Sequence, residues 1–298
     1  MYPIFLNLNL FSVFPPLVHY EVNAIPVTES DYPWIARVIH SRYSEKPHMC
    51  TATCIHPEIF ITAYRCIHSL HLPYIRVIYN TEILNTKAIV SPSNNSKQSY
   101  DDIGFIVVHK GYRGTWYTVD LFNINRTDST YKWYSKLTFN DTHKVVGYAL
   151  KKDLYKFRTA DTEFRLTELE VYIEFLLCKE VFTFSYLMGQ FNVPCYHSCT
   201  LEEYRRDEKK CDNYHGVEGG AVINMKTNRL LGLATWGAYY SKYELPVGMS
   251  VVNSKNFFES FSCAKKIQKN EMTVVAEFYY QNLCDKGTSN RRFHFNMF

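Results

Sequence analysis

Cysteine is the residue type in this sequence whose number and spacing most clearly point to chemistry. The chain has nine cysteines among 298 residues, and thiols in such number either form disulfides or bind a metal. Structural zinc sites use paired ligands such as C-x2-C followed by H-x3-H, and this combination does not occur here. The spacing therefore predicts disulfide bonds, no metal site and no cofactor, in an oxidising compartment.

Three Asn-x-Ser/Thr triplets agree with such a compartment, since they are acceptors for N-glycosylation. They stand at Asn94, Asn125 and Asn140. Residues 1–20 are apolar but have no basic start, and the run is too short to span a bilayer comfortably. We interpret it as a leader segment, so the mature chain should be extracellular and have no membrane span.

The composition excludes several classes of protein. Hydrophobic residues make up 46% of the chain and aromatic residues 16%, so a substantial core is expected and wholesale disorder is not. The net charge of +4 comes without a block of Lys and Arg, which argues against nucleic-acid binding. The charges from Glu202 to Lys210 alternate in sign and nearly cancel, which predicts a solvated loop.

Short β-type runs bounded by turn residues dominate the rest of the chain, which predicts a β-sandwich or a pair of barrels. One helical pattern occurs late, from Ser254 to about Lys269, with phenylalanines at helical spacing and lysines at its end. The expected strands cover residues 34–40, 59–63, 75–79, 103–108, 145–150, 169–173, 221–224 and 230–236.

Four segments carry specific motifs in a specific order. Cys50 precedes Cys66 by sixteen residues, and Thr62–Cys66 reads TAYRC. Asp102–Ile106 reads DIGFI, Gly216–Ala221 reads GVEGGA, and Leu231–Gly237 reads LGLATWG. In order and spacing these segments resemble the TAAHC, DIALL, GDSGGP and LVGIVSWG motifs of the trypsin-like serine proteases.

The resemblance implies an all-β fold of two six-stranded antiparallel β-barrels followed by a C-terminal α-helix. We expect the trypsin-like domain to cover residues 21–262, with barrels at about 31–140 and 141–253. The C-terminal helix and an extension would then occupy residues 254–298.

The resemblance also implies that the catalytic residues have been replaced. Arg65 stands at the His position and Glu218 at the Ser position, and only Asp102 remains of the triad. The oxyanion-hole positions are Gly216 and Glu218. A guanidinium cannot act as a base near neutral pH, and a carboxylate has no hydroxyl to attack a carbonyl. We expect Arg65 to lie between the two carboxylates.

Two further regions depart from the family pattern. Val217 stands where the family has the Asp that pairs with a newly freed terminal ammonium, and counting back places that terminus near Glu21. Both halves of this buried ion pair are therefore missing. The loop before Glu218 is rebuilt, which argues against a pocket for basic residues at the pocket-equivalent positions Asp212, Thr235, Trp236 and Gly237.

The family resemblance also implies a disulfide between Cys50 and Cys66. Cys178 should pair with Cys195 or Cys199, and the one left over should pair with Cys211; the spacing leaves the connectivity open. Cys263 and Cys284 could tie the tail to the helix. Cys54 lies on an expected core strand and is interpreted as a buried free thiol.

These observations favour a non-catalytic, secreted serine-protease homologue that acts by protein binding, as a cofactor, decoy or regulator of proteolysis. Its partners would be extracellular proteins, proteases or their substrates among them. Two alternatives stay open. One is a residual hydrolase with non-triad chemistry, and the other is a structural or glycan-binding secretory component.

Overall fold

The structure is a computed structural model of the full chain. It describes residues 24–41, 48–67, 72–90, 102–122, 141–150, 164–173, 194–207, 217–235 and 246–270, and all structural statements below refer to these ranges.

The first barrel is a closed antiparallel sheet in the order β2-β3-β4-β7-β6-β5. Its core is rich in β-branched and aromatic side chains, and every residue of β4 and β7 is buried. Such side chains suit a pleated surface packed on both faces, which is why these runs form strands. The strands are β2 (Ile35–His40), β3 (His48–His56), β4 (Ile59–Ala63), β5 (Ile75–Tyr79), β6 (Glu82–Val90) and β7 (Ile103–Val108).

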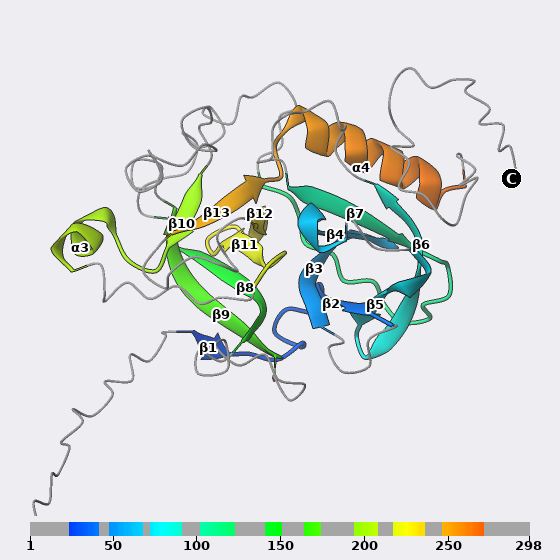
Figure 1. The fold of residues 1–298 in the computed structure, drawn as a ribbon, viewed down its shortest axis with the longest axis horizontal. Helices are drawn as coiled ribbons and strands as arrows, with labels where there is room; N and C mark the ends of the chain where they lie inside the picture. The colour runs from blue at the N-terminus through cyan, green and yellow to red at the C-terminus, as the bar shows by residue number, and fades with distance from the viewer. Residues whose placement is uncertain are drawn as a thin grey trace, which may run out of the picture.

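The second barrel follows the order β9-β10-β13-β12-β11-β8 and closes through pairing of β8 with β9. A further short strand, β1 (Ile25–Pro26), adds to β9. Figure 1 shows the two barrels side by side. The strands are β8 (His143–Leu150), β9 (Phe164–Ile173), β10 (Cys195–His197), β11 (Ala221–Asn224), β12 (Arg229–Ala234) and β13 (Val247–Val251). The prediction of two six-stranded barrels is confirmed.

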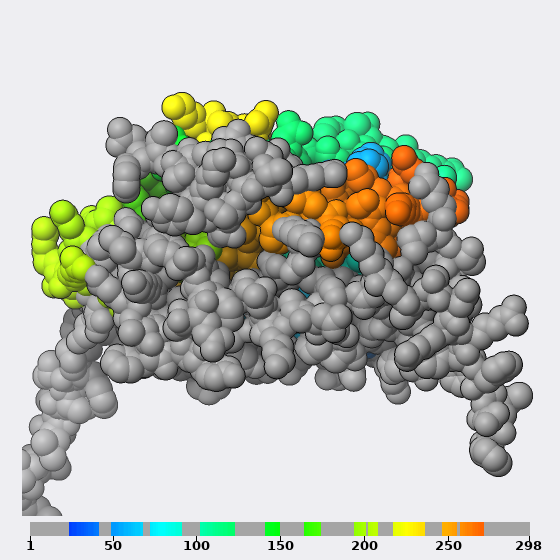
Figure 2. Space-filling view, turned by 90° about the horizontal axis from the view of Figure 1, so that it is seen from above, coloured from blue at the N-terminus to red at the C-terminus, as the bar shows by residue number. Residues whose placement is uncertain are grey.

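The predicted C-terminal helix is also confirmed, as α4 (Lys255–Gln268). Ser254 caps it by accepting a hydrogen bond from the Phe257 N–H at 3.0 Å. The helix packs on β7, β6 and β4, so the second half of the chain returns to cover the first barrel (Figure 1). Its outer face forms part of the surface seen from above (Figure 2).

The prediction of a solvated loop from Glu202 to Lys210 is wrong over its first half. Residues Leu201–Arg206 form a short helix, α3. Thr200 accepts a hydrogen bond from the Glu203 N–H, and the Glu203 carboxylate accepts one from the Thr200 N–H. This reciprocal capping box is visible in the sequence as T-x-x-E and stabilises the first turn, whereas charge alternation alone does not distinguish a helix from a loop.

Candidate functional site

Arg65 lies in η1 (Tyr64–Cys66), a single 3-10 turn that begins directly after the buried strand β4. The turn is anchored by a disulfide from Cys66 to Cys50 on β3, with 6.3 Å between the two Cα atoms. This bond confirms the predicted pairing. A bridge that closes a loop of this length stabilises the fold by about 3 kcal/mol in the chain-entropy model.

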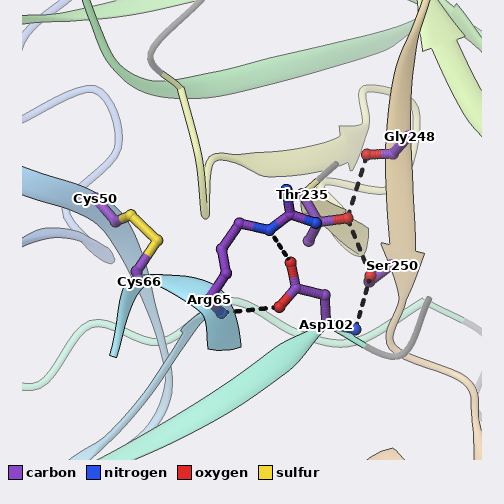
Figure 3. A network of polar contacts seen from close by, with 7 residues as sticks. All are labelled: Cys50, Arg65, Cys66, Asp102, Thr235, Gly248 and Ser250. Atoms are coloured by element: carbon purple, nitrogen blue, oxygen red, sulfur yellow. Dashed lines mark hydrogen bonds and ion pairs between the residues drawn. A yellow bond between two sulfur atoms is a disulfide. The ribbon is translucent and has the colours of Figure 1, made fainter. Parts of the chain in front are cut away.

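Asp102 lies immediately before β7 and is buried, with 7% of its surface exposed. The Arg65 backbone N–H donates to its Oδ1 at 2.9 Å, and the Arg65 Nε donates to its Oδ2. Figure 3 shows both bonds between the two residues. The Arg65 side chain itself is 38% exposed, so this is a charge-assisted pair with one member in the interior and one at the surface.

Asp102 is held from the second barrel as well. Its N–H donates to the Ser250 Oγ on β13 at 3.2 Å, and that hydroxyl lies 3.0 Å from the Thr235 Oγ1. Thr235 in turn donates to the Gly248 carbonyl at 3.3 Å. Figure 3 shows this chain of contacts running from the ion pair to β13. The Arg65–Asp102 pair therefore lies where the two barrels meet.

Sequence reasoning did not find Ser250 or Gly248. Both stand in the apolar run Val247–Val251, where a small residue predicts nothing beyond close packing. The link to Asp102 spans 148 positions along the chain, and no local pattern reports a contact of that separation. Thr235, by contrast, was among the predicted pocket residues, and the structure places it in this network.

Glu218 lies in the turn before β11 and is buried, with 5% of its surface exposed. Its backbone carbonyl accepts a hydrogen bond from the Thr51 N–H on β3 at 2.9 Å. The turn is thereby attached to the first barrel although it belongs to the second. A direct contact between Glu218 and Arg65 stays a prediction.

Several predicted site residues lie outside the described residues. They are Gly216 of the oxyanion-hole pair, the pocket residues Asp212, Trp236 and Gly237, and the glycosylation candidates Asn94, Asn125 and Asn140. The leader segment and Glu21 also lie outside. Within the described ranges, His, Cys, Asp and Glu do not gather into a group that could hold a metal ion. No helix in these ranges has the length and apolar character needed to cross a bilayer.

The cysteines of the second barrel and of α4 are disulfide-bonded, namely Cys195, Cys199 and Cys263. The other cysteines expected to pair with them, Cys178, Cys211 and Cys284, lie outside the described residues, so their connectivity stays a prediction. Cys54 is buried and free, as expected. Burial raises the pKa of its thiol, so the reactive thiolate is disfavoured.

The chemistry open to the Arg65–Asp102 pair is narrow. A guanidinium carries only donors and keeps its charge at any ordinary pH, so it cannot take up a proton from a neighbouring hydroxyl. Asp102 already accepts two hydrogen bonds from Arg65. The pair can therefore hold structure and present part of a positive charge at the surface, but it cannot act as a general base.

Comparisons with known proteins agree with this architecture. The family model described as Trypsin matches residues 22–165. Among solved structures, the scabies mite inactivated protease paralogue S-D1 matches with a TM-score of 0.59 and 14% identity, over 85% of this chain and 99% of that one. The Vibrio cholerae VesB protease matches with a TM-score of 0.56 and 14% identity, over 85% and 68%.

No curated protein sequence matches the chain. At 14% identity the two solved structures are evidence for the fold alone. The family model is matched by the sequence itself, and the match covers the segments with Arg65 and Asp102. The motifs, the two closed barrels and the family model together show a trypsin-like serine protease fold, with the family model matching residues 22–165.

Proposed function

We propose that this chain is a non-catalytic homologue of the trypsin-like serine proteases that acts by binding other proteins outside the cell. The observation that carries the proposal is the Arg65–Asp102 ion pair. In the family's mechanism the Asp orients an imidazole, which removes the proton of a Ser hydroxyl. Here the carboxylate of Asp102 binds a guanidinium instead, and Glu218 occupies the Ser position of the motif.

The loss of both groups has a large expected consequence. In a triad protease, removing the nucleophile or the base lowers turnover on the order of a million-fold. Hydrogen-bond donors of an oxyanion hole would not compensate, because the Glu218 carboxylate would repel a developing anion near them. Peptide hydrolysis by the triad mechanism should therefore be absent.

The first test is enzymatic. The purified full chain should neither hydrolyse peptide and ester substrates nor be labelled by a fluorophosphonate probe, whereas an active family member assayed in parallel should do both. Burst kinetics or stoichiometric labelling of the full chain would overturn the proposal. Such a result would instead favour the alternative hypothesis of a residual hydrolase.

The second test concerns binding. The immobilised chain should retain extracellular proteins by a contact that saturates and competes with the soluble chain. The double variant Arg65→Leu with Asp102→Asn is the matched comparison, since it removes both charges of the pair together. Loss of retention in this variant would place the contact at the old catalytic site, and unchanged retention would place it elsewhere on the surface. Retention of glycans but no protein would favour a glycan-binding component instead.

Secretion belongs to the same proposal and has its own support. Disulfides at Cys50, Cys66, Cys195, Cys199 and Cys263 are stable in an oxidising compartment and rare in a reducing one. The full chain expressed in secreting cells should appear in the medium and lose mass on treatment with an N-glycosidase. Replacing each of the three acceptor asparagines with Gln should remove that mass in steps.

A further inference from the structure

Val217 is fully buried, with no exposed surface, and packs within the apolar cluster of the second barrel. Two glycines make room for it. A Cβ atom at Gly147 would lie 2.7 Å from the Val217 Cγ2, and one at Gly220 would lie 2.6 Å from the same atom. Both distances are shorter than real Cβ contacts allow, so the valine fits into a space that only glycine leaves open on these two sides.

The turn that follows Val217 is held by one backbone hydrogen bond to β12 and by one within the turn itself. The Gly219 N–H donates to the Ala234 carbonyl at 2.8 Å, and the Gly220 N–H donates to the Val217 carbonyl at 2.7 Å. Gly219 has a φ of +77°, and a Cβ there would lie 2.1 Å from the Thr51 carbonyl oxygen. The turn of residues 217–220 is therefore closed between β12 and β3 in one backbone conformation.

The N-terminal end of the described part of the chain is attached to the second barrel at a different place from the turn of residues 217–220. We call the contacts that attach it the N-terminal clasp. They are the pairing of β1 with β9, the bond from the Val27 N–H to the Leu166 carbonyl at 3.0 Å, and two tyrosine bonds. The Tyr148 hydroxyl donates to Glu29 at 2.6 Å, and the Tyr32 hydroxyl donates to Glu168. None of these contacts involves the turn of residues 217–220.

We propose that Val217 is an apolar wedge that locks the turn carrying Glu218, and that this lock works independently of the N-terminal clasp. Apolar packing needs no terminal ammonium, whereas a buried Asp at this position would need one to balance its charge. The buried side of the old catalytic site would then have its final conformation as soon as the second barrel folds. This inference concerns the fold of the turn and holds whether or not the proposed binding function does.

Native-state hydrogen exchange of the full chain tests the proposal, because the amides of Gly219, Gly220 and Ala234 report on the turn and that of Val27 reports on the clasp. Val217→Ala should accelerate exchange at the three turn amides by at least about tenfold relative to globally exchanging core amides. Exchange at Val27 should change little. Val171→Ala, in the same apolar cluster on β9, is the matched control and should shift all core amides together.

Tyr148→Phe provides the reciprocal variant. It removes the bond to Glu29 and should accelerate exchange at Val27 while the three turn amides keep their rates. If Val217→Ala does not fold, Val217→Thr retains the side-chain shape but buries a hydroxyl, and it should act in the same direction. The proposal is overturned if Val217 variants affect the turn no more than Val171→Ala does. It is equally overturned if Tyr148→Phe loosens the turn as much as Val217→Ala.

Discussion

Two carboxylates of this protein, the buried Asp102 and the half-buried Glu168, are neutralised in different ways. Asp102 accepts two hydrogen bonds from one residue, from the backbone N–H and the Nε of Arg65. Glu168 on β9 accepts from two residues of different elements, from the Tyr32 hydroxyl and from the Lys144 Nζ on β8 at 2.5 Å.

The difference shows what each cluster depends on. One side-chain truncation deprives Asp102 of its only cation among the contacts described above. Glu168 would keep a neutral donor after loss of Lys144. Because an unpaired buried charge is more destabilising than a weakened pair, the site of Asp102 should be the more sensitive of the two to substitution.

The largest effect is expected from Arg65→Leu. This variant removes the guanidinium that donates to the buried carboxylate of Asp102, and breaking a buried pair typically costs about 3–5 kcal/mol. The exposed fraction of Arg65 places the loss at the lower end, at about 3 kcal/mol in the free energy of unfolding. Chemical denaturation of the variant beside the parent measures it.

The control for this variant removes the charge on the other side as well. Arg65→Leu combined with Asp102→Asn and Glu218→Gln should recover much of the lost stability, since no uncompensated charge is left. If Arg65→Leu alone unfolds at the same denaturant concentration as the parent, the stability of the fold does not depend on the Arg65 guanidinium. The contrast with Glu168 would then disappear.

The second-largest effect concerns the pH dependence of stability and the side chain of His143, which is buried without an ion-pair partner in the contacts described above. His143, next to Lys144 on β8, is 5% exposed, and its Nε2 has no hydrogen-bond partner within the described residues. Burial lowers the pKa of His143 to about 4, against a smaller opposite effect of Asp141. Because the folded pKa is depressed, the unfolded chain binds the proton first as the pH falls below about 6.5.

His143 therefore leaves stability unchanged above pH 6.5 and reduces it progressively between pH 6.5 and about 4. Linkage with these two values gives a loss of about 2 kcal/mol at pH 5. His143→Gln should flatten this part of the pH profile of stability. A profile that keeps its slope in the variant would assign the acid sensitivity to groups other than His143.

Lys144→Leu is the counterpart of Arg65→Leu in the other cluster. Glu168 keeps the hydrogen bond from Tyr32, and Lys144 is partly exposed. We expect a loss of about 1 kcal/mol, roughly a third of that at Arg65. Equal losses in the two variants, measured by the same denaturation experiment, would show that the number of donor residues does not decide the sensitivity.

The smallest effect is expected from Tyr148→Phe, which removes one hydrogen bond to the half-buried carboxylate of Glu29. Bonds of this kind contribute about 0.5–1.5 kcal/mol, and water can replace the lost donor, so a loss of about 0.5 kcal/mol is expected. Thermal unfolding measures the change. A loss as large as that of Lys144→Leu would show that water does not replace the donor that Glu29 loses.

Much of the fold could be predicted from the sequence because its signals are local. The apolar runs at residues 59–63, 75–79, 103–108 and 221–224 coincide with β4, β5, β7 and β11. The strand β3 was expected only through Cys54, and the strands β1, β6, β10 and β13 were missed, as was α3. β6 alternates polar and apolar residues only weakly, and β10 has three residues, too few for any period to show.

The sequence by itself determined which residue types stand in the motifs around Arg65, Asp102 and Glu218, and it predicted the disulfide of Cys50 with Cys66 and a position of Val217 that needs no charged partner. These follow from ordered motifs, each of which occupies a few consecutive residues. Only the tertiary structure decided that Ser250 supports Asp102 and that two glycines enclose Val217. It also decided that Tyr32 shares Glu168 with Lys144. Such contacts join residues that are up to 148 positions apart, and the closure of the barrels, rather than any local propensity, brings them together.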